Sequence, residues 1–111
     1  MRCLRYEHVK FGDVLYEIHY KDARLLHDYI LKRDYALVLA DIPYRFCIPG
    51  CMHDDTVAWG QPEIAAMVRA FKVVTTARLW RIIIIHSLDQ FAVVKAVLEQ
   101  ECNGGIQSCM W

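Results

Sequence analysis

The sequence has no excess of charge of either sign, because 13 Lys and Arg residues balance 13 Asp and Glu residues among 111. A strongly basic nucleic-acid-binding domain is therefore excluded, although a local basic patch is not. Long apolar runs are also missing: stretches such as residues 35–40 are far shorter than the roughly 20 residues of a membrane-spanning helix. The first ten residues lack the apolar centre of a secretory signal. We therefore expect no membrane partner.

Five cysteines, an odd number without a secretory signal, favour free thiols over a disulfide framework. We expect an intracellular protein, cytoplasmic or nuclear. Cys47, Cys51 and His53 form a C-x3-C-x-H pattern, which is not a recognised zinc motif and lacks an obvious fourth ligand, so no metal is predicted. Hydrophobic residues make up 56% of the chain and charged residues 23%, which predicts one folded domain over residues 1–111.

Strand-like and helix-like segments alternate along the chain. Alternating, continuous or helically spaced apolar residues distinguish them. The predicted strands are residues 13–20, 35–40, 79–87 and 106–111, and the predicted helices are residues 22–32, 62–72 and 88–101. This alternation predicts an α/β fold with a short, mostly parallel sheet of three or four strands and flanking helices.

The helical spacing predicts which side chains face the core. In the second helix these are Ile64, Met67, Val68 and Phe71, and in the third helix they are Phe91, Val94 and Leu98.

Acids follow two of the predicted strands, and ligands of open α/β sheets bind beyond the carboxyl ends of strands. Asp22 is placed to cap the first helix. Asp41 directly follows a continuous apolar strand, where its carboxylate must be hydrogen-bonded or solvated. Pro43 restricts the backbone of Ile42, so the carbonyl groups there are held in a defined direction, and Tyr44 adds an aromatic face. An acid, a fixed carbonyl and an aromatic plane are suited to holding a planar amine.

The sequence Ala-Asp-Ile-Pro-Tyr at 40–44 resembles motif IV of the amino-methyltransferases, which methylate N6 of adenine or N4 of cytosine and usually carry Asp/Asn/Ser-Pro-Pro-Tyr/Phe/Trp. Residues 20–44 also resemble the GDA…LL…YDLVLADPPY arrangement of these enzymes, and the order of segments is most similar to the permuted class of DNA enzymes. The resemblance implies a Rossmann-like methyltransferase-type sheet, S-adenosylmethionine as cofactor, and DNA or RNA as partner.

The resemblance also implies roles for the motif residues. Asp41 and the Ile42 carbonyl would accept the hydrogens of the target amine, with Pro43 fixing the turn. Tyr44 would stack on the flipped base. Asp22 would lie near the adenine of S-adenosylmethionine.

The sequence departs from the family in two places. Ile42 stands where proline is usual. The related ribosomal-RNA adenine dimethylating enzymes also carry a branched residue at this place of the motif. The aromatic-x-Gly-x-Gly loop for S-adenosylmethionine is absent. We therefore expect a fragment or shortened relative of these enzymes. The alternatives are a catalytically inactive methyltransferase-like module that binds nucleic acid or a partner protein, and an unrelated small α/β domain.

Three further expectations concern the surface. Arg69 and Lys72 share a helix face and would either contact phosphates or remain solvated. His86, at a strand end, would be either a base or a hydrogen-bonded structural residue. Because buried-type strands such as the one over residues 79–87 require neighbours, we expect self-association or a partner that completes the sheet.

Overall fold

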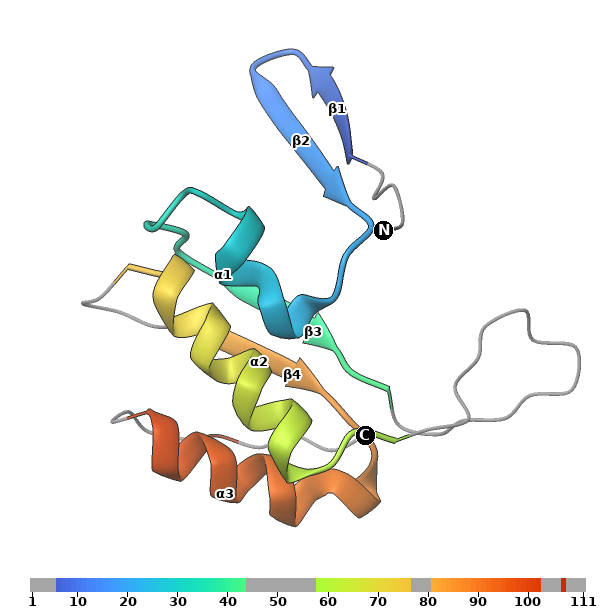
Figure 1. Ribbon diagram of the computed structural model, residues 1–111, viewed down its shortest axis with the longest axis vertical. Coiled ribbons are helices and arrows are strands. Elements are labelled where there is room, and N and C mark those ends of the chain that lie inside the picture. Colours follow the sequence, from blue (N-terminus) through green and yellow to red (C-terminus); the bar gives the residue numbers. More distant parts are fainter. Residues whose placement is uncertain (1–5, 44–57, 77–80, 103–106, 108–111) are drawn as a thin grey trace, which may run out of the picture.

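The computed structural model describes residues 6–43, 58–76, 81–102 and 107, with backbone alone for residues 6–9 and 15. It is a mixed α/β structure (Figure 1). The strands are β1 (Tyr6–Phe11), β2 (Val14–His19), β3 (Val38–Asp41) and β4 (Ile82–Ile85), and the helices are α1 (Leu26–Tyr29), α2 (Gln61–Val74) and α3 (Phe91–Glu101), with short 3-10 helices η1 (Ala23–Leu25) and η2 (Leu88–Gln90).

The described strands form two separate sheets of two strands each. β3 and β4 are parallel, with Val38 opposite Ile82 and Asp41 opposite Ile85, which confirms a small parallel sheet. The prediction that residues 13–20 belong to this sheet is wrong. β2 pairs antiparallel with β1 instead, because Gly12 adopts φ +56° and allows a two-residue turn between neighbouring strands. The fourth strand predicted at residues 106–111 lies outside the described residues.

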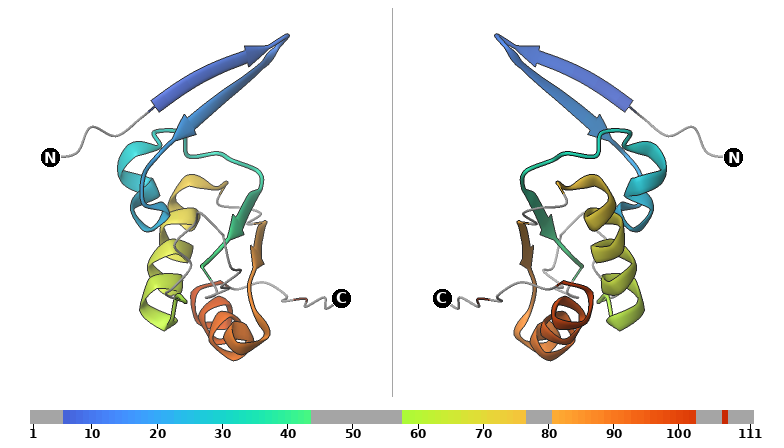
Figure 2. Two further views of the ribbon diagram at one scale, coloured as in Figure 1. Left: turned by 90° about the vertical axis from the view of Figure 1, so that its right-hand side faces the viewer. Right: turned by 90° about the vertical axis from the view of Figure 1, so that its left-hand side faces the viewer.

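The helices cover one face of the parallel pair, while the β1–β2 hairpin projects from the body of the molecule (Figures 1 and 2). Side chains of the two strands alternate between the faces, as the pleat requires. Toward the helices lie Val38, Ala40, Ile82 and Ile84, which are buried or partly buried. On the opposite face lie Leu39, Asp41, Ile83 and Ile85, all exposed. A parallel sheet is ordinarily covered on both faces.

The core forms where α2 packs against α3, η1 and α1 and against the inner face of the sheet. Gly60 precedes α2 and Pro62 lies in its first turn, as expected of a helix start. The core positions predicted for this helix are confirmed: Ile64, Met67, Val68 and Phe71 are at most 3% exposed.

In α3 the predicted core positions are only partly right. Val94 is buried and Leu98 packs against the core. Phe91 is 39% exposed, and Val97 takes the buried position instead. Among the described residues, no helix is both long enough and apolar enough to cross a membrane.

Two valines on α2 provide a matched test of this core. Val68 is fully buried and Val73 is 46% exposed. We expect Val68→Ala to lower the free energy of unfolding by about 2 kcal/mol, because it leaves a cavity in the core. Val73→Ala should change it by less than about 0.5 kcal/mol. Urea denaturation of both variants measures the difference, and equal effects would contradict this packing.

Candidate functional site

Asp41 lies at the carboxyl end of β3, at the edge that this strand shares with the end of β4. Its carboxylate is exposed on the face that the helices leave open. The next residue, Ile42, turns inward: it is 2% exposed and its N–H donates a hydrogen bond to the Ile85 carbonyl at 3.3 Å. The buried Ile42 side chain anchors the strand end, so the position of the neighbouring acid is fixed by the core.

The carbonyl of Pro43 is fully engaged within the protein. It accepts hydrogen bonds from the N–H of Trp59 at 3.0 Å and from Nε2 of Gln90 at 2.8 Å. A carbonyl oxygen has two lone pairs, so no acceptor capacity remains for a ligand. By contrast, none of the residues that the structure describes donates a hydrogen bond to the Ile42 carbonyl. Neither the Asp41 carboxylate nor the Ile42 carbonyl is therefore occupied by a donor from the part of the chain that the structure describes.

Gln90 holds the segments around this strand end together. Its Nε2 donates to the Trp59 carbonyl at 3.0 Å as well as to that of Pro43, and its Oε1 accepts from the N–H of Ser87 at 3.1 Å. The residue is 5% exposed, and both ends of its amide are hydrogen-bonded as a buried amide requires. Gln90 was not among the predicted site residues, although Ser87-x-x-Gln90 has the spacing of a capping box, which is a signal for it in the sequence.

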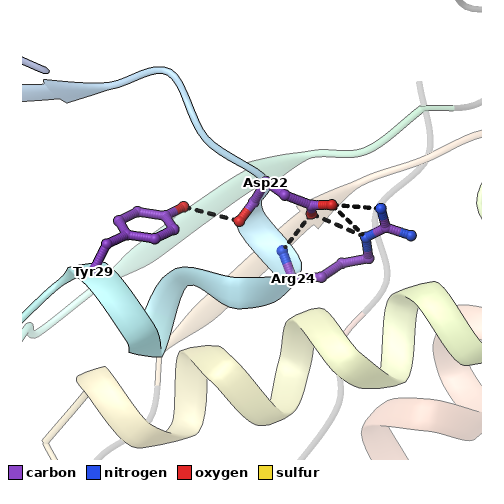
Figure 3. Close-up of polar contacts among 3 residues, drawn as sticks. All are labelled: Asp22, Arg24 and Tyr29. Carbon is purple, nitrogen blue, oxygen red and sulfur yellow. Dashed lines mark hydrogen bonds and ion pairs between the residues drawn. The ribbon is translucent and has the colours of Figure 1, made fainter. Parts of the chain in front are cut away.

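The predicted role of Asp22 as a helix cap is confirmed, because it is the N-cap residue of η1. Its carboxylate accepts a hydrogen bond from the N–H of Arg24 at 2.9 Å, and Nε of Arg24 donates to both carboxylate oxygens at 2.9 and 3.0 Å (Figure 3). These hydrogen bonds from the Arg24 side chain hold the pKa of Asp22 below its usual value, against partial burial, which raises it. The Asp22 carbonyl accepts from the hydroxyl of Tyr29 at 3.0 Å.

Asp22 does not share the strand-end edge with Asp41, because β2 belongs to the hairpin and not to the parallel sheet. The two acids are connected indirectly. The guanidinium carbon of Arg24 lies 5.3 Å from the centre of the Trp59 ring, and the N–H of Trp59 donates a hydrogen bond to the Pro43 carbonyl. Arg24 thus links the helix cap to the segment that follows Asp41.

The remaining candidates divide into engaged residues and residues outside the described ranges. Nε of Arg69 donates to Oε1 of Glu101 at 2.8 Å, and Lys72 bonds to the Glu101 carbonyl, so both cations are engaged by α3. Nδ1 of His86 lies 2.7 Å from the Ser87 carbonyl, which favours the structural interpretation.

Tyr44 and the pattern of Cys47, Cys51 and His53 lie outside the described residues. Among those that are described, no group of His, Cys, Asp and Glu side chains could hold a metal ion.

No protein-family model, curated protein or solved structure matches the chain.

The amide of Gln90 can be tested against a second glutamine on the same helical segment. Gln90→Ala removes the donor to the Trp59 carbonyl and one of the two donors to the Pro43 carbonyl, so we expect it to lower the free energy of unfolding by about 2 kcal/mol. Gln100→Ala, at an exposed position of α3, should change it by less than about 0.5 kcal/mol. Thermal or urea unfolding measures both. A Gln90→Ala protein as stable as the control would contradict the role of this amide.

Proposed function

We propose that this chain carries the amine-holding part of an S-adenosylmethionine-dependent amino-methyltransferase, acting on N6 of adenine or N4 of cytosine in DNA or RNA, as a fragment or shortened relative of these enzymes. The observation that supports the proposal is the pair of adjacent acceptors, the Asp41 carboxylate and the Ile42 carbonyl, at the carboxyl end of the parallel strand β3. The fold in this proposal is an incomplete Rossmann-like sheet.

The chemistry of an exocyclic amine suits these two acceptors. Such an amine has two N–H bonds, and its nitrogen lone pair is delocalised into the ring. If Asp41 accepts one hydrogen and the Ile42 carbonyl the other, the lone pair is directed out of the base plane and becomes more available to an electrophile. Fixing the amine in this orientation is a positioning effect, the largest contribution that a binding site can make to a two-reactant transfer. Tyr44 is the proposed stacking partner of the base.

The described residues do not fit the methyl donor as they fit the amine. The glycine loop is absent from the sequence, and the carboxylate of Asp22, the proposed contact to the donor, is bound to Arg24. This engagement favours a second candidate function, a catalytically inactive module that binds a nucleic-acid base or a partner protein without transferring a methyl group.

Two exposed apolar surfaces support a second copy of the chain as partner. The hairpin surface comprises Phe11, Val14, Tyr16 and Ile18, which are 39% to 68% exposed. The open sheet face comprises Leu39, Ile83 and Ile85, which are 40% to 64% exposed. A lone two-stranded hairpin is at best marginally stable in water, and a parallel sheet is normally covered on both faces. Self-association that buries both surfaces would satisfy both requirements.

Methyl transfer and donor binding test the proposed function together. We expect Asp41→Ala to reduce methyl transfer to adenine- or cytosine-containing DNA and RNA at least 100-fold while the affinity for S-adenosylmethionine, measured by calorimetry, stays within twofold. Asp22→Ala should weaken donor binding. Asp28→Ala, at an exposed acid of α1, is the control and should leave both quantities unchanged.

The possible outcomes separate the two candidate functions. Unchanged transfer in Asp41→Ala would refute the role of Asp41. No donor binding at millimolar concentration, with base binding that still depends on Asp41, would establish the inactive module.

Light scattering tests self-association. The monomer has a mass of 13.0 kDa, and we expect a larger species at micromolar concentration. Tyr16→Lys and Leu39→Lys should each shift it toward the monomer, because they place a charge in a surface that must be dry when buried. Leu88→Lys, at a side chain 75% exposed outside both surfaces, is the control. A monodisperse wild-type monomer would contradict the proposal.

A further inference from the structure

A cavity of about 290 Å³ lies between the end of the hairpin strand β2 and the segment that follows α1. Its walls combine cations and aromatic rings: Lys21, Lys32, Tyr29, Tyr35 and His19, together with the acid Glu17. Asp41 and Ile42 do not line it. Its volume lies just below the range of small-molecule sites, which begins at roughly 300 Å³, so it suits a small ligand.

Each lysine of the cavity lies over a tyrosine ring. Nζ of Lys21 is 4.9 Å from the centre of the Tyr29 ring, and Nζ of Lys32 is 4.8 Å from that of Tyr35. Cation–π contacts of this kind orient an ammonium group without neutralising its charge. The two cations therefore remain able to attract an anion into the cavity.

The aromatic walls are fixed by the rest of the fold. The hydroxyl of Tyr29 donates to the Asp22 carbonyl, and its ring packs at 5.3 Å from that of His19 (Figure 3 shows the hydroxyl contact). The backbone of Tyr35 makes two hydrogen bonds at the end of α2. Its N–H donates to the Val74 carbonyl and its carbonyl accepts from the N–H of Thr76, each at 3.0 Å. Rigid rings preorganise the lysine stems that lie on them, which reduces the entropy lost when a ligand binds.

Among the described residues that line the cavity, lysines outnumber carboxylates. Lys21 pairs with no carboxylate among the described residues, and Lys32 lies 3.9 Å from Asp34, whose side chain is 75% exposed. Glu17 is the only carboxylate among the described residues that line the cavity, and its Oε2 lies 3.7 Å from Nε2 of His19. The two lysines outnumber this carboxylate, so the described lining favours an anionic ligand.

We propose that this cavity binds a phosphate group. Lysine ammonium groups are established ligands of phosphate, and the tyrosine rings supply apolar walls for the sugar or base beside it. The same chemistry serves a free nucleotide and the backbone of a single-stranded nucleic acid. The proposal requires neither Asp41 nor a methyl donor, so it stands or fails separately from the proposed methyl transfer.

Calorimetric titration at low ionic strength with inorganic phosphate, adenosine monophosphate and a short single-stranded oligonucleotide tests the cavity. The double variant Lys21→Gln/Lys32→Gln removes both cations. The double variant Lys10→Gln/Lys95→Gln removes the same charge from two exposed lysines that do not line the cavity. Circular dichroism confirms that each variant is folded.

We expect the cavity variant to bind the phosphate-containing probe at least tenfold more weakly, with the control within twofold of wild type. Tighter binding of the oligonucleotide than of the nucleotide identifies a nucleic-acid backbone as the source of the phosphate, and the reverse order identifies a free nucleotide. Equal losses in the two double variants, or no binding of any probe to the wild type, would overturn the proposal.

Discussion

The buried amide of Gln90 is the interaction on which the geometry of the strand end depends. One side chain joins three segments that are distant in sequence: the end of β3 through Pro43, the approach to α2 through Trp59, and the turn after β4 through Ser87. A buried amide without partners is costly, so these bonds exclude most alternative arrangements of the three segments. Together with the N–H of Trp59, the amide occupies the Pro43 carbonyl, whereas no described residue donates to the Ile42 carbonyl.

The elements that the sequence predicted correctly are those with a strong local period. The α2 helix has an unbroken apolar face, and β3 and β4 lie in short apolar runs. Residues 13–20 contain the predicted strand, but the prediction of its partner strand was wrong. A strand can pair either with a distant parallel strand or with a neighbouring antiparallel one, and the local pattern does not distinguish the two. Gly12 decides between them by allowing a two-residue turn. Phe91 was misplaced because η2 precedes α3 and sets which face of that helix turns inward.

The candidate site was predictable to a similar extent. An acid that directly follows a continuous apolar strand must be hydrogen-bonded or solvated, so the exposure of Asp41 follows from its local sequence. The cap by Asp22 also follows from local sequence, but its distance from the sheet edge does not, since it depends on which sheet β2 joins. The contact between Arg24 and Trp59 joins segments 35 residues apart, and no local pattern encodes it.

The open sheet face and the exposure of Asp41 have the same physical origin. The alternation of β3 places Asp41 on the same open face as Leu39, beside Ile85 of β4. In water, a carboxylate gains little from binding a neutral amine, because the amine already has water as a partner. Covering the open face would remove that water and strengthen the hydrogen bonds of Asp41 through the lower local dielectric. A partner that buries Leu39, Ile83 and Ile85 would therefore stabilise the sheet and raise the affinity of its carboxyl edge for an amine in one step.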